Sequence, residues 1–257
     1  MTPDQLKRGL AYAKRNFLEE KTTHLWLDKK IIKEFFDLTD KSVLDFGCGM
    51  GGMTLWYASQ WKCHVHGVDI DEHHIKIARA LHQEYDLENV SLMKEDILRS
   101  NEQEIYDVIF LNDVVEHIPL PALEEILNRL SSLLKQDGTI YLSYPPWHSP
   151  YASHINRAIK LPWVQFLPDA FIISLLERHN KKTLSKLEGD LIEVYLGLNK
   201  ITYRKLMKII NKTDLILSRR ISHSFFNKFK RLKNTQLHFF PFNFLVTKEV
   251  VFLKKGK

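Results

Sequence analysis

The segment at residues 43–52, which reads VLDFGCGMGG, constrains the fold more than any other part of the chain. An apolar strand that runs into a glycine cluster permits a tight turn and close approach of a ligand to the backbone. The N-terminus of the following helix then presents free N–H groups to an anionic group. Gly47, Gly49 and Gly52 satisfy the spacing G-x-G-x-x-G, which alone is a weak signal. The segment predicts a strand–turn–helix unit that holds a nucleotide-like ligand.

Short apolar runs alternate with amphipathic segments on both sides of this turn. We expect strands at 42–46, 63–68, 90–93, 106–111, 139–144, 215–222 and 245–253. We expect helices at 4–20, 24–37, 51–60, 71–85, 120–134 and 202–211, the fifth of them stopped by Asp137-Gly138. Such alternation implies a parallel sheet with helices on both faces. The predicted fold class is α/β: a Rossmann-like, doubly wound, mostly parallel seven-stranded sheet.

No linker rich in Pro, Gly or Ser divides the 257 residues, so we expect 1–257 to form a single domain. Residues 1–40 would form an N-terminal helical cap and residues 41–144 a cofactor-binding core. Residues 145–199 are too long for an ordinary loop, and we interpret them as a lid insertion after the fifth strand. Residues 200–257 would supply the C-terminal helix and the last two strands.

Composition excludes several classes of protein. Hydrophobic residues make up 44% of the chain and charged residues 26%, which is typical of globular proteins rather than disordered ones. Two cysteines, Cys48 and Cys63, are too few for a disulfide-stapled module. The first residues lack the apolar region of a signal peptide, and no apolar run approaches the roughly 18–20 residues of a membrane span. We therefore expect a cytoplasmic protein.

Carboxylates follow the first three predicted strands. Asp45 precedes Gly47 by two residues, where it suits a ligand with an ammonium group better than a pyrophosphate. Asp69 ends the second strand, 20 residues after Gly49, where a carboxylate can accept both hydroxyls of a ribose. Asp96 follows the third strand and can accept from an exocyclic adenine amine. The strand ends thus offer sites for an amino acid, a ribose and an adenine, in that order.

These segments resemble the class I S-adenosylmethionine-dependent methyltransferases. VLDFGCGMGG is similar to their glycine motif, GVDID at 67–71 to their ribose-binding segment, and KEDI at 94–97 to their adenine-side motif. YDVIFLNDVVEHI at 106–118 is similar to their fourth strand and its exit. The resemblance implies S-adenosylmethionine as cofactor. It assigns the methionine end to Asp45 and Gly47, the turn to Cys48 and Gly49, the ribose to Asp69 and Ile70, the adenine to Asp96 and Ile97, and the sulfonium to Asn112 and Asp113.

The segment DVVEH at 113–117 bears on the chemistry. Methyl transfer from a sulfonium needs alignment, and a hydroxyl acceptor also needs a base or a metal ion. DVVEH resembles a segment of the ubiquinone O-methyltransferases and of the small-RNA 2′-O-methyltransferases, which hold a divalent cation there. Asp113 stands where those groups have Glu and reaches less far by one methylene. We expect a metal-free site with His117 as base; the alternative is a divalent ion on Asp113, Glu116 and His117.

The start of the predicted lid reads WHSPYASH at 147–154 and should lie over the same pocket. His154, ahead of His148, is the second candidate base, and either could complete a metal site. An aromatic, proline-stiffened lid suits a planar or phenolic acceptor. We interpret His73 and His74 as surface residues, far from the strand ends.

The segment at 219–244 combines cations with phenylalanines, and residues 200–257 carry 15 Lys and Arg against Asp214 and Glu249, a net charge of +13. Three interpretations compete: packing of the Phe side chains on the sheet, which we favour, peripheral membrane contact, and nucleic-acid binding. The predicted function is methyl transfer to a small molecule, a hydroxyl of an aromatic or lipid-like metabolite. The alternative is an RNA 2′-O-methyltransferase or nucleic-acid-binding protein. The sequence does not indicate an oligomeric state.

Overall fold

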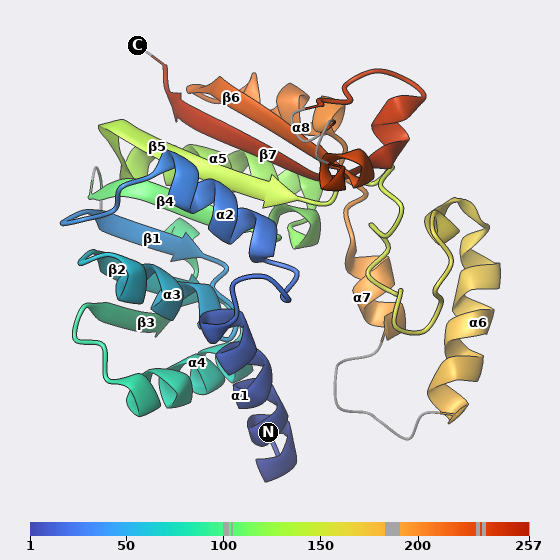
Figure 1. Ribbon diagram of the computed structural model, residues 1–257, viewed down its shortest axis with the longest axis horizontal. Helices are drawn as coiled ribbons and strands as arrows, with labels where there is room; N and C mark the ends of the chain where they lie inside the picture. Colours follow the sequence, from blue (N-terminus) through green and yellow to red (C-terminus); the bar gives the residue numbers. More distant parts are fainter. Residues whose placement is uncertain (100–102, 104, 183–190, 230–231, 233–234, 257) are drawn as a thin grey trace.

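The described residues of the computed structural model contain one seven-stranded sheet (Figure 1); they comprise the whole chain except 100–102, 104, 183–190, 230–231, 233–234 and 257. The strands are β1 (Ser42–Phe46), β2 (His64–Asp69), β3 (Val90–Lys94), β4 (Tyr106–Asn112), β5 (Leu134–Tyr144), β6 (Leu215–Ser224) and β7 (Val246–Lys255). Their order is β3-β2-β1-β4-β5-β7-β6. Only β7 runs antiparallel to its neighbours β5 and β6. The predicted mostly parallel seven-stranded fold is confirmed.

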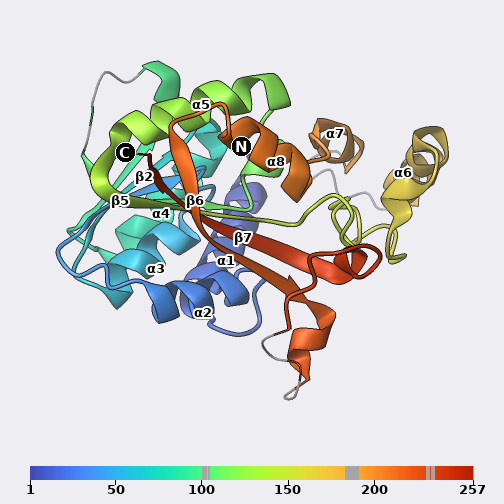
Figure 2. The same ribbon diagram turned by 90° about the horizontal axis from the view of Figure 1, so that it is seen from above.

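Helices cover both faces of this sheet (Figure 2). The described helices are α1 (Pro3–Leu18), α2 (Trp26–Phe35), α3 (Gly52–Gln60), α4 (Glu72–Tyr85), α5 (Leu120–Leu133), α6 (Asp169–Lys182), α7 (Leu191–Gly197) and α8 (Tyr203–Ile210), of which α6 and α7 lie beside the sheet rather than on its faces. Strand β4 shows why both faces are covered. Val108 and Phe110 pack with α1–α4, while Ile109 and Leu111 pack with α5 and α8. Since side chains alternate along a strand, a continuous apolar run serves two cores.

The junction of α5 and β5 differs from the prediction. The helix ends at Leu133, and the strand begins at once with Leu134, which is buried and paired with Tyr106 of β4. Gly138, expected to end the helix, lies inside β5. A Cβ atom there would lie 2.7 Å from the Leu134 side chain, so glycine is required by packing rather than by a turn.

The segment expected to form a lid is irregular over 145–163 and helical in α6 and α7, and it lies beside the sheet, next to the connection from β6 to β7 (Figure 1). It has a small apolar core of its own, formed by Ile155, Ile159, Val164, Ile172, Leu176 and Tyr195. No described helix combines the length and apolar character that crossing a bilayer requires.

The connection from β6 to β7 contradicts the favoured interpretation of 219–244. Its phenylalanines were expected to pack on the sheet, but several have about half or more of their surface exposed. These are Phe225 (52%), Phe229 (52%), Phe239 (62%), Phe240 (77%) and Phe242 (45%). The connection extends past the ends of β6 and β7, beyond the faces that the helices cover (Figure 2).

Candidate cofactor and acceptor sites

The glycine turn joins β1 to α3 and forms the floor of the first site. Gly47 has φ of 70° and Gly49 has φ of 52°, values that glycine adopts without strain. A Cβ on Gly47 would meet Val114 at 2.7 Å, so this glycine is needed for packing against the loop after β4. The same atom on Gly49 would have no neighbour within 4 Å. Gly49 therefore faces open space, where a ligand can approach the backbone.

Asp69 is held at the end of β2 by backbone donors. Its two carboxylate oxygens accept from the N–H of Gly49 at 2.9 Å and the N–H of Asp71 at 2.8 Å. Burial alone would raise the pKa of Asp69, but the nearby His74 imidazole and the hydrogen bonds from the N–H groups of Asp71 and Gly49 lower it below its usual value. The carboxylate is thus ionised and oriented, as a ribose site requires. His74, expected to be a remote surface residue, instead places Nδ1 3.7 Å from Asp69.

Asp69→Ala is expected to weaken S-adenosylmethionine binding by roughly tenfold to 150-fold, because hydrogen bonds to a charged group contribute about 1.5–3 kcal/mol. Calorimetric titration measures the Kd. Glu72→Ala, which removes a nearby carboxylate with ion pairs only to the exposed Lys76 and Lys94, is the matched control and should bind normally. Equal Kd values for the two variants would place the ribose elsewhere.

Asp45 and Asn112 meet in a cavity of about 140 Å³ that the turn residues Gly47, Cys48 and Gly49 also line. Burial raises the pKa of Asp45 to about 7, while a hydrogen bond from the Thr54 hydroxyl at 2.6 Å partly opposes this. Asn112 donates to the Tyr57 hydroxyl at 2.6 Å. Its buried carbonyl oxygen has no partner.

This acceptor-rich corner fits a cationic ammonium group, which would ionise Asp45 fully and satisfy the amide oxygen of Asn112. Thr54 and Tyr57, which orient those two side chains, were not identified from the sequence. Both lie on α3, where a Thr and a Tyr within an apolar helix are indistinguishable from ordinary packing residues.

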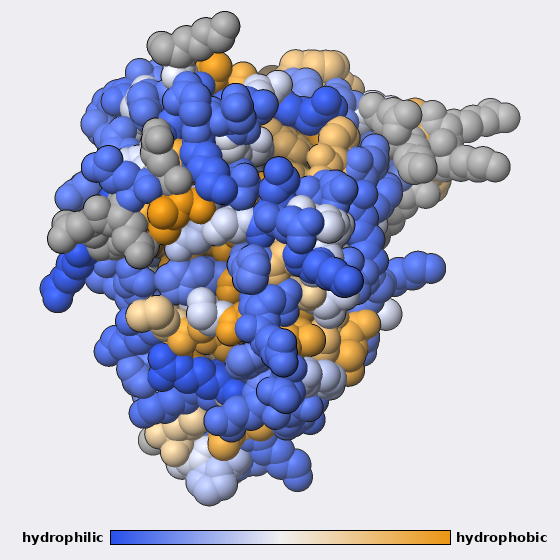
Figure 3. Space-filling model, turned by 90° about the vertical axis from the view of Figure 1, so that its left-hand side faces the viewer, coloured by the Kyte–Doolittle hydropathy of each residue, from blue (hydrophilic) through white to orange (hydrophobic). Residues whose placement is uncertain are grey.

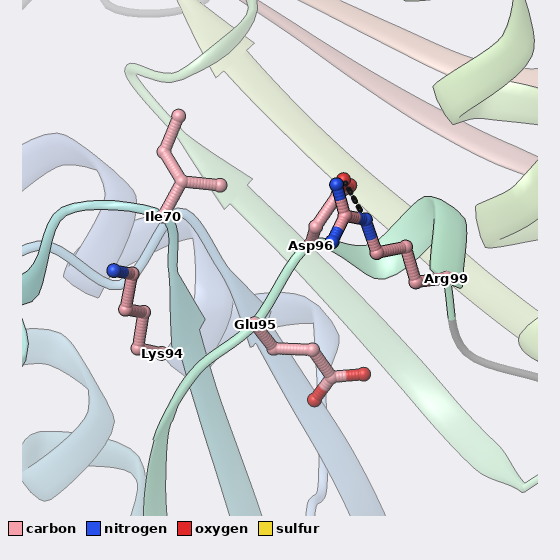
Figure 4. A pocket seen from close by; sticks show the side chains of 5 residues that line it. All are labelled: Ile70, Lys94, Glu95, Asp96 and Arg99. Carbon is pink, nitrogen blue, oxygen red and sulfur yellow. Dashed lines mark ion pairs between the residues drawn. The ribbon is translucent and has the colours of Figure 1, made fainter.

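The end of β3 forms a second recess, of about 410 Å³, which Ile70, Lys94, Glu95, Asp96 and Arg99 line (Figure 4). Asp96 accepts from the N–H of Leu98 at 3.2 Å, and its other oxygen lies 3.3 Å from Arg99 Nε. Ile70 is 75% exposed and offers an apolar surface that a flat ring could cover. The Ile97 side chain is buried in the core, so only its backbone can face a ligand.

Asp113 follows β4 in the left-handed region, with φ of 54°. Lys248 of β7 donates to Asp113 at 2.9 Å and also pairs with Asp28 of α2. The Tyr141 hydroxyl donates to the second Asp28 oxygen at 2.7 Å. Burial alone would lower the pKa of Lys248, but Asp113 and Asp28 outweigh it and raise that pKa above its usual value.

This buried network was not predicted from the sequence. Asp28 is fully buried and Lys248 is 8% exposed. The signal available was a Lys within the apolar strand at 246–253, which in a sheet strand between two neighbours needs a buried partner. Through Lys248, the network links Asp28 of the N-terminal cap to Asp113 in the loop after β4.

A third cavity, of about 830 Å³, adjoins the 140 Å³ cavity around Asp45 and is called the larger cavity from here on. Three residues line both cavities: Tyr12, His24 and Asp113. The larger cavity is also lined by Arg15, Trp26, Leu27, His117, Pro145, Tyr151, His154, Asn156, Arg157, Leu191, Val194, His223, Phe225, Thr247 and Lys248. His148 is not among them, because its ring packs against Phe244 with centroids 5.7 Å apart.

Glu116, His117 and His154 form one polar group at this cavity. The two imidazole rings have centroids 5.1 Å apart, and His154 Nε2 lies 3.8 Å from a Glu116 oxygen. One ligand atom from each residue lies within 4.8 Å of the others. The sequence suggested Asp113, Glu116 and His117 as metal ligands. In the structure Asp113 is paired with Lys248, and the third residue beside Glu116 and His117 is His154 from the lid segment.

Burial sets the protonation of this group. It lowers the pKa of His117, partly opposed by the charge of Asp113, and lowers that of His154 to about 4. Burial and the charge of Asp113 raise the pKa of Glu116 well above its usual value, and neither of its oxygens has a partner among the described residues. At pH 7 the imidazoles are neutral and His117 has a lone pair for a proton.

Comparisons with known proteins agree with this geometry. Residues 38–164 match the family model described as "Methyltransferase domain". Over 116 residues, 44% of this chain and 26% of the relative, it is 31% identical to phosphoethanolamine N-methyltransferase 2 of Caenorhabditis elegans. Over 110 residues, it is 34% identical to ubiquinone biosynthesis O-methyltransferase of Neisseria meningitidis serogroup C, with 42% of this chain and 45% of the relative covered. The matches thus span less than half of these curated relatives.

The structural similarity covers more of the chain than the sequence similarity does. It is similar to that of geranyl diphosphate C-methyltransferase from Streptomyces coelicolor A3(2), with a TM-score of 0.56 over 99% of each chain at 12% identity. The glycine turn, the strand order and the family model matched over residues 38–164 identify this core as a methyltransferase domain of the class I S-adenosylmethionine-dependent type, a family whose methyl donor is S-adenosylmethionine.

Proposed function

We propose that the chain binds S-adenosylmethionine across the turn of β1 and transfers a methyl group to a hydroxyl of an aromatic or lipid-like small molecule in the larger cavity. The observation that carries this proposal is the wall shared by the two cavities, formed by Tyr12, His24 and Asp113. A donor and an acceptor held on its two sides would meet there. Such alignment can lower a barrier by about 7–11 kcal/mol.

S-adenosylmethionine supplies an electrophilic methyl group when bound. The chain orients it through Asp45 and Asn112 at the amino-acid end and Asp69 at the ribose. A hydroxyl acceptor must lose its proton as it attacks, and His117 is the group we propose for that step. His154, with a pKa of about 4, is too weak a base for it. Instead, its ring can orient the acceptor by a hydrogen bond.

The walls of the larger cavity favour an acceptor with an apolar body. Trp26 and Leu27 come from the N-terminal cap, Leu191 and Val194 from α7, and Phe225 from the β6–β7 connection. The relatives named above methylate N, O or C atoms by their names, so similarity does not choose the atom. Our choice of a hydroxyl rests on His117.

The proposal is tested by calorimetry and by turnover. We expect binding of S-adenosylmethionine and no binding of NADH, followed by release of S-adenosylhomocysteine with a panel of phenolic and isoprenoid alcohols. A matched panel of amines and a short RNA serve as comparison acceptors. Binding of NADH alone would favour a dehydrogenase, and turnover only with RNA or only with amines would contradict the proposed acceptor.

We expect EDTA to leave turnover unchanged. Asp113 is paired with Lys248, and burial raises the pKa of Glu116 well above its usual value, which disfavours an ionised carboxylate beside the two imidazoles. Divalent cations such as Mg²⁺ and Mn²⁺ favour carboxylate ligands. The assay compares EDTA-treated enzyme with and without added Mn²⁺. Loss of turnover that Mn²⁺ restores would instead assign an ion to Glu116, His117 and His154, which would lower the pKa of the acceptor hydroxyl.

A further inference from the structure

The described part of the connection between β6 and β7 exposes large apolar side chains, of which Phe225 alone is also among the lining residues of the larger cavity. Phe239 and Phe240 are 62% and 77% exposed and lie just before the short helix Phe242–Leu245 that leads into β7, where Phe239 packs against Phe242. Phe225 and Phe229 form a second exposed group nearer the end of β6. Exposed apolar side chains grouped in this way favour contact with a partner or a membrane.

The predicted lid extends this surface. Phe166 contacts Phe244 with ring centroids 5.8 Å apart, and the Trp163 ring N–H donates to the Phe244 carbonyl at 3.3 Å. These contacts join the two segments. We use the name aromatic surface for the exposed residues Leu161, Phe166, Leu167, Phe171, Phe225, Phe229, Phe239, Phe240 and Phe242.

In the β6–β7 part of the aromatic surface the charged residues of the sequence are all basic, whereas the lid part also holds Asp169, which pairs with Lys200. The sequence has no Asp or Glu between Asp214 and Glu249, whereas it places Lys and Arg repeatedly between the phenylalanines. Cations beside apolar side chains suit the anionic headgroups and acyl chains of a membrane interface. By contrast, the face on the left-hand side of Figure 1 is mainly hydrophilic, with apolar side chains in small patches (Figure 3).

The ring geometry favours lipid over nucleic acid. Phe239 and Phe242 meet edge to face at an interplanar angle of 69°, and Phe225 and Phe229 at 75°. Rings packed in this way use one another as partners, whereas base stacking needs flat, separate ring faces. The aliphatic Leu161 and Leu167 would add nothing to base stacking, but they add area that lipid can bury.

The aromatic surface reaches the mouth of the larger cavity. Phe225 lines that cavity and is 52% exposed, and Tyr151 lines it and is 49% exposed. We propose that the aromatic surface inserts into the interface of an anionic lipid bilayer and thereby turns the cavity mouth toward the membrane. That a membrane-borne acceptor enters there rests on the proposed function, whereas the lipid contact does not.

Vesicle sedimentation tests the lipid contact without any catalytic readout. We expect the full chain to sediment with phosphatidylglycerol vesicles, more weakly with phosphatidylcholine vesicles and less at high salt. Phe239→Ser with Phe240→Ser should lower the partition coefficient by about 100-fold, since each buried phenylalanine contributes at least about tenfold. Both side chains are exposed, so the melting temperature should not change.

The matched control replaces two exposed apolar residues at the two edges of the sheet, Met93→Ser and Ile216→Ser, which are 48% and 52% exposed. It should sediment like the wild type. Equal losses in both double variants, or no sedimentation of the wild type, would overturn the proposal. So would RNA binding that the Phe239/Phe240 variant loses, or a dimer in light scattering that it abolishes. Failure of methyl transfer with intact vesicle binding would contradict only the proposed function.

Discussion

Replacing His117 by glutamine is expected to lower kcat by about 10²–10⁴-fold, because an amide fills similar space but cannot accept the acceptor's proton. The Kd for S-adenosylmethionine should remain unchanged, since His117 lines only the larger cavity. Burial lowers the pKa of His117 below its usual value of 6.5. The wild-type rate should therefore be flat near pH 7 and fall as acid protonates the imidazole below that lowered pKa.

Two variants complete this experiment. His73→Gln changes an exposed histidine on α4 and should leave kcat unchanged. His154→Gln should cost at most about tenfold, because a group with a pKa of about 4 is a poor base at pH 7. If His154→Gln reduced kcat more than His117→Gln, or if the acid limb of the rate profile survived in His117→Gln, the assignment of the base would be wrong.

Lys248→Met is expected to lower the free energy of unfolding by roughly 3–5 kcal/mol, since it leaves the buried Asp28 and the neighbouring Asp113 without their shared cation. Urea denaturation monitored by circular dichroism measures this change. Lys254→Met, an exposed lysine on the same strand, is the matched control and should stay within about 0.5 kcal/mol of the wild type.

A double-mutant cycle separates the ion pair from other effects of the lysine. In the Lys248→Met background, Asp28→Asn removes the uncompensated charge and should recover stability, with a coupling energy of about 0.5–3 kcal/mol. Additive losses in the double variant would show that the two side chains do not stabilise each other, and would contradict the network.

The meeting of the glycine turn and Asp69 at one edge of the sheet was predictable because each of these features is local in sequence. Gly47 and Gly49 both need a positive φ within a single turn, and Asp69 is the last residue of β2. Parallel strands place their carboxyl ends at one edge of a sheet, so a strand pattern is enough to bring these residues together. The continuous apolar run of β4 likewise predicted that this strand is buried on both faces of the sheet.

The end of α5 shows where local pattern fails. Asp137-Gly138 has the composition of a helix stop, yet β5 starts at Leu134, because that side chain fills the core beneath α5 and pairs with Tyr106. Packing across the sheet therefore set the boundary between α5 and β5 and outweighed the turn propensity of Asp137-Gly138. His74 was misjudged for a similar reason, since the register of α4 on the sheet, not its sequence, brings the ring to Asp69.

The sequence by itself determined the seven-stranded fold and the position of Asp45, Asp69 and Asp96 near the ends of three strands, since both follow from periodicity and short spacings. Only the tertiary structure decided which charges are paired. Asp113 was predicted as a candidate ligand, but Lys248 neutralises it from a strand 135 residues away in the chain. Likewise, His154 joins Glu116 and His117 while His148, six residues earlier, turns to Phe244. Such contacts depend on how distant elements pack, because a side chain's protonation and partners are set by every group around it, and no short-range pattern records those groups.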